Sequence, residues 1–374
     1  MPKVATVSFF LLIITGLLFF GNLVVYEAVV LAFGITGLLQ LVCLALGLVF
    51  LSVSFIAATM IGNWHYNVFT RVYYTLSSLW MGFFFYFFVA SVIYGMTVAL
   101  SSSYASIGPF LFLTALLVSL YGMLHARKIV VTHIPVSLLN LPTSWENKKA
   151  VWISDVHLGQ IHGVEFARKV VAKISALSPD IIFVGGDLYD GTGAPDISEL
   201  TAPLEALSAP LGVYFITGNH EEYGNLERFL SAVESAGMRV LKDEMVEIDG
   251  VQLIGVDYRN ASDPLRFKEI LSKIPINREK ISILLKHEPR DVPIAQTAGI
   301  SLLLSGHTHN AQMWPLAYIP RLIYKGYAYG LNVFDTMLVY TSSGTGTWGP
   351  PMRVGTDSEI VLFSFKEKST ISRT

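Results

Sequence analysis

Formal charge is scarce in the first third of this sequence. Over residues 1–126 only Lys3, Glu27 and Arg71 are charged, and 24 of the 26 basic and 27 of the 28 acidic residues lie further along the chain. A soluble domain usually carries about a quarter charged residues, so this region avoids water. The rest of the chain is close to neutral, and neither part is basic enough to indicate nucleic acid as a partner.

Cysteine is limited to Cys43, which lies inside an apolar run. A single cysteine excludes a disulfide within the chain and a cysteine-based metal site. We expect its thiol to face lipid or a neighbouring helix.

Long uncharged apolar runs fill the region that lacks charge. A bilayer core of roughly 30 Å needs about 20 apolar residues in a helix. Four runs reach this length, namely Ala5–Tyr26, Ala28–Ile61, Val72–Leu100 and Ile107–Leu124. Breaks at Glu27, residues 63–65 and residues 101–103 separate them, and Gly34 with Gly37 indicates an interfacial stretch or kink. The sequence therefore predicts about four transmembrane helices.

These runs are interpreted as a membrane anchor. A transporter places ionisable side chains near the middle of the bilayer, and the runs lack them, so a transporter with a regulatory domain is the alternative. No small-residue cleavage site follows the first run, which favours an uncleaved anchor. Basic residues favour the cytoplasmic side, and Lys3, Arg71 and the pair Arg127–Lys128 predict that both termini are cytoplasmic. We expect a multi-pass cell-membrane protein.

After Lys128 the pattern changes to short β-branched runs that alternate with helical segments, which is typical of α/β layers. We expect strands at Ile129–Ile134, Ala150–Ser154, Ile181–Val184, Val213–Ile216, Val251–Gly255, Ser282–Leu285, Ser301–Ser305, Leu338–Thr341 and Ile360–Phe365, and helices at Val164–Ser175, Leu226–Ala236 and Pro264–Ser272. The sequence thus predicts an all-α transmembrane domain over residues 1–127 and a globular domain over residues 128–374.

Side chains that bind metals follow five of the expected strands. They are Asp155, His157, Asp187, Asn219, His287, His307 and His309. Ligand sites in an open α/β sheet gather beyond the carboxyl ends of the strands, so these side chains should converge. One such residue alone means little, and His65, His125 and His133 are interpreted as structural. Five motifs at five strand ends together predict a metal centre.

The motifs resemble the signature of the calcineurin-like metallophosphoesterase superfamily. They read Asp155-Val156-His157, Gly186-Asp187-Leu188-Tyr189-Asp190, Gly218-Asn219-His220-Glu221, His287 and Gly306-His307-Thr308-His309, intact and in order. The runs Ser154–Gly159 and Gly346–Arg353 are similar to those of its membrane-attached bacterial branch. The resemblance implies a four-layer sandwich in which two mixed sheets are flanked by helices, with two metal ions at one end.

The same resemblance implies the roles of single residues. The first metal would be held by Asp155, His157, Asp187 and His309, and the second by Asp187, Asn219, His287 and His307. Two divalent cations such as Mn²⁺, Fe²⁺ or Zn²⁺ outweigh the two aspartates, which suits an anionic phosphate, and they activate a bridging water. His220 would stabilise the transition state or protonate the leaving oxygen. Asp190 would orient a metal ligand.

Two departures from the superfamily bear on the substrate. Protein serine/threonine phosphatases carry an arginine where this chain has Gly191, which argues against that activity. Relatives in the membrane-attached branch often continue Gly-His-Thr-His with Gly-Gly-Gln, whereas this chain has Asn310-Ala311-Gln312. A difference on the substrate side follows from the second departure.

The segment Met313–Lys325 is aromatic and aliphatic, with Arg321 and Lys325 interspersed. One hypothesis is that it faces the bilayer and admits a lipid tail, with Trp314 in the apolar layer and the two bases near lipid phosphate. The alternative is a loop packed on the core of the domain.

The sequence therefore predicts a membrane-anchored phosphoesterase with two divalent metal ions. It would hydrolyse a phosphate ester or pyrophosphate bond in a small molecule or a lipid-linked substrate, next to membrane lipids and without nucleic acid. A catalytically silent scaffold of the same fold is a further alternative, although such scaffolds typically lose metal ligands and none is lost here.

Overall fold

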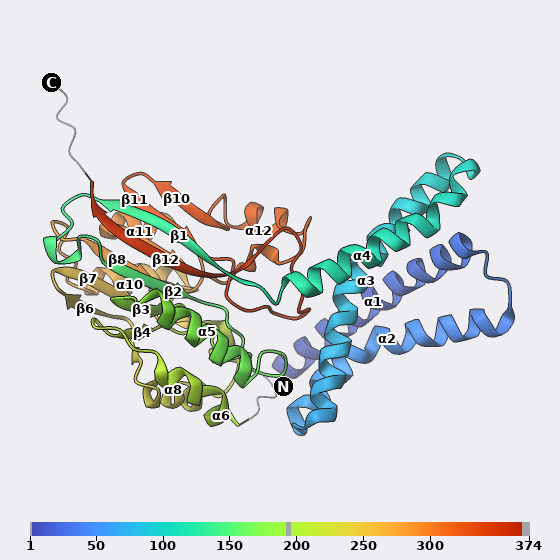
Figure 1. Cartoon of the computed structure of the whole chain (residues 1–374), viewed down its shortest axis with the longest axis horizontal. Helices are drawn as coiled ribbons and strands as arrows, with labels where there is room; N and C mark the ends of the chain where they lie inside the picture. The colour runs from blue at the N-terminus through green and yellow to red at the C-terminus, as the bar shows by residue number, and fades with distance from the viewer. Residues whose placement is uncertain (1, 192–195, 369–374) are drawn as a thin grey trace. The chain divides into compact units, whose positions relative to one another are not determined.

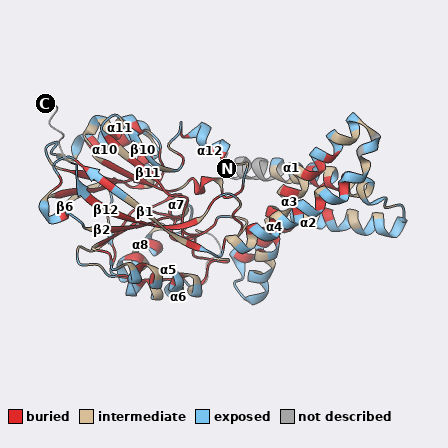
Figure 2. Cartoon of the chain, turned by 45° about the horizontal axis from the view of Figure 1, so that its top comes forward, coloured by how far each residue is buried: buried red, intermediate tan, exposed pale blue. Residues whose placement is uncertain are grey.

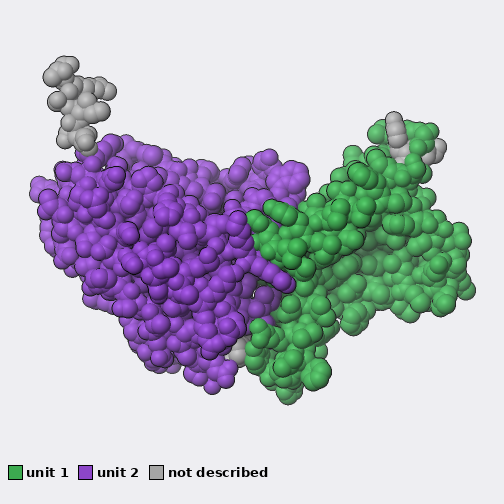
Figure 3. Space-filling model, in the orientation of Figure 1, with its two compact units in different colours: residues 1–125, 349–352 green, residues 126–348, 353–374 purple. Residues whose placement is uncertain are grey.

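The computed structural model describes residues 2–191 and 196–368 of the chain. It separates into two compact units, one with residues 1–125 and 349–352 and one with residues 126–348 and 353–374 (Figure 3). The first unit is helical, and the second contains the sheets.

The helical unit consists of long apolar helices (Figure 1). They are α1 (Pro2–Phe33), α2 (Leu38–Trp64), α3 (Val68–Leu100) and α4 (Gly108–His125), with the 3-10 helix η1 (Ser102–Ile107) before α4. Four segments among the described residues are long and apolar enough to cross a membrane, at Ile13–Phe33, Leu38–Trp64, Val68–Leu100 and Ala105–His125. The predicted number of spans is confirmed.

The boundary between the first two spans was predicted wrongly at Glu27. Helix α1 continues through Glu27 to Phe33, and the chain leaves the helix at Gly34, whose φ of 59° is left-handed. One exposed carboxylate does not end a helix, whereas a left-handed glycine does. The stretch from Gly34 to Gly37, expected as an interfacial stretch or a kink, connects α1 to α2.

Small and hydroxyl side chains pack in the interior of the helical unit. The hydroxyls of Ser52, Ser91 and Ser119 donate to the carbonyl oxygen four residues earlier, so each is satisfied within its own helix. Asn22 of α1 donates to Ser52 Oγ of α2 at 3.0 Å and joins the two helices. Small residues allow membrane helices to approach closely, while many leucine and phenylalanine side chains are exposed, as lipid contact requires.

The second unit alternates strands and helices. The strands are β1 (Ile129–Leu138), β2 (Lys149–Ile153), β3 (Ile181–Val184), β4 (Val213–Phe215), β5 (Arg239–Val240), β6 (Glu244–Ile248), β7 (Val251–Gly255), β8 (Ser282–Leu285), β9 (Leu302–Ser305), β10 (Gly330–Phe334), β11 (Met337–Thr341) and β12 (Ser358–Glu367). The helices are α5 (Val164–Leu177), α6 (Ile197–Thr201), α7 (Asn219–Tyr223), α8 (Leu226–Ser235), α9 (Tyr258–Ala261), α10 (Pro264–Lys273), α11 (Val292–Ala298) and α12 (Tyr318–Ile323), with short 3-10 helices η2 (Thr143–Trp145), η3 (Ala202–Ala206) and η4 (His309–Ala311).

The strands form two mixed sheets. The first has the order β1-β12-β2-β3-β4-β5, with β2 to β5 parallel and β12 antiparallel to β2. The second has the order β10-β11-β9-β8-β7-β6, with β11, β9, β8 and β7 parallel and the two outer strands antiparallel. All nine predicted strands are present.

Alternating side chains of each strand build separate cores, because successive residues point to opposite faces. In β3, Ile182 packs in the core beneath α5 and α8, and Phe183 packs in the core between the two sheets. In β8, Ile283 joins the central core and Leu284 joins a third core with α10 and α11. Figure 2 shows the buried residues concentrated along the strands, and the predicted four-layer sandwich is confirmed.

Candidate metal centre

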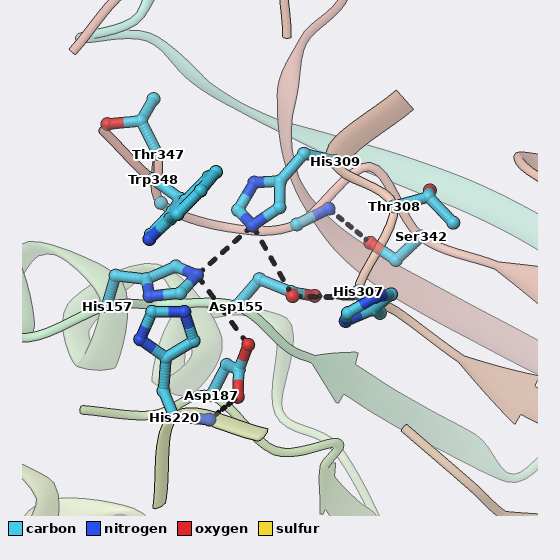
Figure 4. A network of polar contacts seen from close by, with 12 residues as sticks. Asp155, His157, Asp187, His220, His307, Thr308, His309, Ser342, Thr347 and Trp348 are labelled. Atoms are coloured by element: carbon cyan, nitrogen blue, oxygen red, sulfur yellow. Dashed lines mark hydrogen bonds and ion pairs between the residues drawn. The ribbon is translucent and has the colours of Figure 1, made fainter. Parts of the chain in front are cut away.

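The predicted ligands gather where the parallel strands end. Asp155 and His157 follow β2, and Asp187 follows β3; the remaining ligands are Asn219 after β4, His287 after β8, and His307 and His309 after β9. Figure 4 shows side chains from both sheets turned toward one space. Three groups among the described residues have ligand atoms within 4.8 Å of one another and can hold a metal ion: Asp155, His157 and His309; His157, Asp187 and His220; and Asp187, His287 and His307.

The first group brings two imidazoles face to face. The Nε2 atoms of His157 and His309 lie 3.1 Å apart, and His309 Nε2 lies 3.5 Å from Asp155 Oδ1. Neutral imidazole nitrogens and a carboxylate oxygen directed at one point form a donor set that suits a divalent cation such as Zn²⁺ or Fe²⁺.

The group of Asp187, His287 and His307 has a similar donor set. His287 Nε2 lies 3.2 Å from Asp187 Oδ2 and 3.3 Å from His307 Nδ1. His307 Nδ1 also lies 2.9 Å from Asn219 Oδ1, which adds an amide oxygen. Four protein atoms from four strand ends therefore surround a second point.

Asp187 lies between the two groups. Its Oδ2 is 3.2 Å from His287 Nε2 and 3.9 Å from His157 Nε2, while its Oδ1 accepts a hydrogen bond from the His220 amide at 2.8 Å. A carboxylate in this place can contact cations on both sides.

The backbone at the ligands is wound in the left-handed region. Five of the seven predicted ligands have positive φ: Asp155 (54°), His157 (51°), Asp187 (50°), His307 (68°) and His309 (49°). Such conformations cost a non-glycine residue on the order of 1 kcal/mol or more and gather at functional sites. They aim successive side chains into the site from tight turns, so the residues present fit a metal centre.

Backbone carbonyls and Asp190 orient the histidines. His287 Nδ1 donates to Gly185 O at 2.7 Å, which leaves Nε2 to face the site. His220 Nδ1 donates to Asp190 O at 2.8 Å, and the Asp190 carboxylate lies 3.5 Å from His157 Nδ1. When the imidazole nitrogen that points away from the site donates a hydrogen bond, the other nitrogen is left unprotonated and free to bind a cation.

Burial and the aspartates shift the pKa values of the site's histidines in opposite directions. Burial lowers the pKa of His287, but the carboxylate of Asp187 outweighs burial and raises that pKa to about 10. Burial also lowers the pKa of His309 well below its ordinary value, and that of His307 falls for the same reason. His287 therefore holds a proton that a binding cation must displace.

Glu221 organises the site, and its role was missed in the sequence. It is fully buried and accepts four backbone hydrogen bonds, from Gly218 at 2.7 Å, Asp187 at 2.9 Å, Leu188 at 2.8 Å and Tyr189 at 3.2 Å. It thus ties the loop after β3 to the loop after β4. Its place directly after Asn219 and His220 was the available signal.

Glu288 is a second residue that the sequence did not single out. Its Oε1 lies 3.7 Å from His307 Nε2 and accepts a hydrogen bond from Tyr324 Oη at 2.8 Å. Burial raises its pKa, but His307 reverses this and lowers it, so the side chain is a carboxylate. It can orient His307 from the side opposite the metal-facing nitrogen.

The predicted substrate residues lie on an exposed surface formed by helix α12 and its flanks. Helix α12 and its flanks expose Trp314, Tyr318, Ile319, Leu322 and Ile323, with Leu322 82% exposed. Arg321 lies over the Tyr318 ring at 5.8 Å, and Lys325 is exposed. Part of the segment, including Met313 and Tyr324, is buried against the domain, so both the lipid-facing hypothesis and the alternative of a loop packed on the core stay predictions.

The comparisons with known proteins agree with this site. A sequence model of the calcineurin-like phosphoesterase family matches residues 148–311. An uncharacterised metallophosphoesterase of Aquifex aeolicus is 33% identical over 264 residues, which are 68% of this chain and 98% of the relative. The chain therefore belongs to the calcineurin-like metallophosphoesterase family.

Two further relatives are longer than the matched region. An uncharacterised metallophosphoesterase of Campylobacter jejuni is 30% identical over 62% of each chain. A transmembrane protein with metallophosphoesterase domain from Danio rerio is 31% identical over 69% of this chain and 62% of its own. The matched region spans about three-fifths of the length of the first of these relatives. With the four apolar helices, these similarities identify a membrane protein.

Proposed function

We propose that this protein is a membrane-anchored phosphoesterase with two divalent cations, of which Mn²⁺, Fe²⁺ and Zn²⁺ are candidates. The first would be held by Asp155, His157, Asp187 and His309, and the second by Asp187, Asn219, His287 and His307. Residues 1–127 form the anchor and residues 128–374 the catalytic domain, which faces the cytoplasm because Lys3, Arg71 and Arg127 flank the same side of the spans.

The donor set supports hydrolysis of an anionic ester. When bound, the two cations supply Lewis acidity and an activated water for attack on phosphorus. Asp155 and Asp187 contribute two negative charges, and the other ligands are neutral, so the loaded site stays positive toward phosphate. The positive charge would attract the anionic substrate. The side chains that follow five strands would position the two cations, and the cations would position the reacting phosphoryl group.

His220 is the proposed proton donor to the leaving oxygen. Its Nδ1 is occupied by the Asp190 carbonyl, so Nε2 is the nitrogen that can exchange a proton with the substrate. Its ring is perpendicular to that of His157 with centroids 4.6 Å apart, which keeps it beside the metal ligands. Asp190 holds both histidines in place.

One observation carries this proposal: side chains far apart in the sequence converge as three overlapping donor groups, two of which contain Asp187. The test uses the purified full-length protein in detergent with Mn²⁺, assayed on p-nitrophenyl phosphate and bis-p-nitrophenyl phosphate. We expect turnover by the wild type and a loss of at least about 100-fold in Asp187→Asn and His220→Ala, since general acid catalysis alone contributes about 10²–10⁴-fold.

Two matched variants control for indirect effects. Asp335→Asn also changes an aspartate with left-handed backbone, and His133→Ala removes an exposed histidine of β1. Both should keep wild-type activity. A wild type that is inactive with Mn²⁺, Fe²⁺ and Zn²⁺ would contradict the proposal and favour a silent scaffold.

We also propose that the α12 surface admits the tail of a lipid-linked ester. Trp314, Leu322 and Ile323 present apolar area, and Arg321 and Lys325 can meet lipid phosphate. A triple change of Trp314, Leu322 and Ile323 to serine should spare hydrolysis of p-nitrophenyl phosphate and reduce turnover of a lipid phosphate ester in vesicles. Equal loss on both substrates would refute this part of the proposal.

A further inference from the structure

The loop that follows β11 runs directly along the metal ligands. The amide of Thr345 donates to Ser154 O, and that of Gly346 donates to Asp155 O, each at 2.9 Å. The loop therefore tracks the end of β2, and it ends at Trp348 beside the site (Figure 4).

A buried guanidinium fixes the middle of this loop. Arg353 is fully buried and donates to Ser343 O and Gly346 O at 2.7 Å each and to His309 O at 3.3 Å. Burying a charge is costly unless it is hydrogen-bonded. These carbonyl oxygens must therefore stay in place around the guanidinium, which holds the loop in one conformation.

A buried histidine fixes the next residue. His162, to which the sequence assigned no role, lies with Nε2 2.8 Å from Thr347 Oγ1 and accepts from the Thr347 amide at 3.0 Å. Burial lowers the pKa of His162 to about 3, so the ring is the neutral acceptor that this contact needs.

Gln312 then clamps the backbone of Trp348 on both sides. Its Nε2 donates to Trp348 O at 2.9 Å, and its Oε1 accepts from the Trp348 amide at 2.7 Å. Gln312 is buried and has a left-handed φ of 56°. It directly follows Asn310 and Ala311, the two positions at which this chain departs from the Gly-Gly-Gln run of the membrane-attached branch, and it retains the glutamine of that run.

The Trp348 side chain contrasts with its fixed backbone. The indole is 56% exposed, and its ring centroid lies 6.0 Å from that of His220 at an interplanar angle of 75°. Tyr223 is 70% exposed, with its ring centroid 5.7 Å from the same imidazole. Exposed aromatic side chains beside a site are typical anchors for a ligand, and the fixed backbone of Trp348 limits where its ring can lie.

We propose that Trp348 determines specificity by stacking on a planar, aromatic leaving group, with Tyr223 as a second contact. The inference rests on the proposed phosphoesterase function. His220 is the proton donor to the leaving oxygen, so the group attached to that oxygen must pass the two rings that neighbour His220. The preferred substrate class is therefore a phosphate ester of an alcohol that carries an aromatic ring system.

The experiment compares two phosphates that differ only in an aromatic base. Adenosine 5′-monophosphate and ribose 5-phosphate are measured as inhibitors of p-nitrophenyl ester hydrolysis by the full-length, Mn²⁺-loaded protein. Stacking of one base on an aromatic side chain is worth roughly five- to 100-fold in binding. We expect the wild type to bind the adenosine compound at least about fivefold more tightly, and Trp348→Ala to abolish this preference.

Further variants separate stacking from folding. Trp348→Phe should keep part of the preference for adenosine 5′-monophosphate. Gln312→Ala should weaken that preference and leave the inhibition constant of ribose 5-phosphate within about twofold of the wild-type constant. Leu265→Ala removes an equally prominent exposed apolar side chain of α10 and should change neither value. A structural role alone would weaken both inhibitors together.

Two outcomes overturn the inference while the phosphoesterase stands. One is hydrolysis of the p-nitrophenyl esters by a wild type that shows no preference between the two phosphates. The other is an equal loss of affinity for adenosine 5′-monophosphate and for ribose 5-phosphate in Trp348→Ala. Absence of any hydrolysis by the wild type would instead refute the function on which the inference rests.

Discussion

The substitution Glu221→Gln tests how the site is held together. The carboxylate receives two amide hydrogens on each oxygen, from Leu188 and Tyr189 on Oε1 and from Asp187 and Gly218 on Oε2. A glutamine keeps one acceptor oxygen and turns an NH₂ group toward the other two donors. Two buried N–H groups lose their acceptor, at about 1–3 kcal/mol each, so we expect a loss of about 2–6 kcal/mol.

This loss should lower the melting temperature by roughly 5–20 °C, since 1 kcal/mol shifts a domain of this size by about 2–4 °C. The assay measures the melting temperature and the metal content of the purified protein. Metal content is included because Glu221 joins the loop that carries Asp187 to the loop that carries Asn219, and both are predicted metal ligands. Glu227→Gln is the matched control. Glu227 is an exposed glutamate of α8, so its replacement should change stability by at most about 0.5 kcal/mol. A Glu221→Gln protein that melts within a few degrees of the control and retains its metals would refute the reasoning.

Two further predictions concern neighbours of the ligands. Glu288→Gln removes the charge beside His307 Nε2 and should weaken binding of one cation about 10- to 100-fold, as measured by Mn²⁺ titration, whereas the exposed Glu279→Gln should not. Burial lowers the pKa of Lys286 to about 8, so folding releases its proton between about pH 8 and 10.5 and stability should rise with pH across that window. The melting temperature of the wild type relative to Lys286→Met should therefore increase from pH 8 to 10.5, and a constant difference would contradict the shift.

Much of the architecture was readable because it follows from local patterns. Uncharged runs predicted the spans, and short β-branched runs predicted the central strands, since both signals come from burial of consecutive side chains. Three strands were missed, β5, β6 and β10, which lie at sheet edges, are at most five residues long and carry partly exposed side chains. Edge strands bury less and therefore leave a weaker pattern.

The candidate ligands were readable because each directly follows a strand, and parallel strands end at a common edge. The supporting residues were not. Glu221 and Arg353 act on backbone amides and carbonyls, which every residue type offers, so no partner residue marks them in the sequence. The clamp of Gln312 on Trp348 joins positions 36 residues apart and likewise depends on the folded path of the chain.

The left-handed turns at Asp155, His157, Asp187, His307 and His309 have a consequence for loading. These turns already direct the predicted ligand side chains toward the site, so the backbone does not have to rearrange when cations bind. Cation binding should therefore be fast and selective for ionic radius. Each left-handed conformation costs on the order of 1 kcal/mol or more, and bound cations would offset part of that cost. Removal of the cations should therefore leave the backbone strain uncompensated. The metal-free protein should unfold at a lower temperature and be cleaved faster by proteases than the metal-loaded protein.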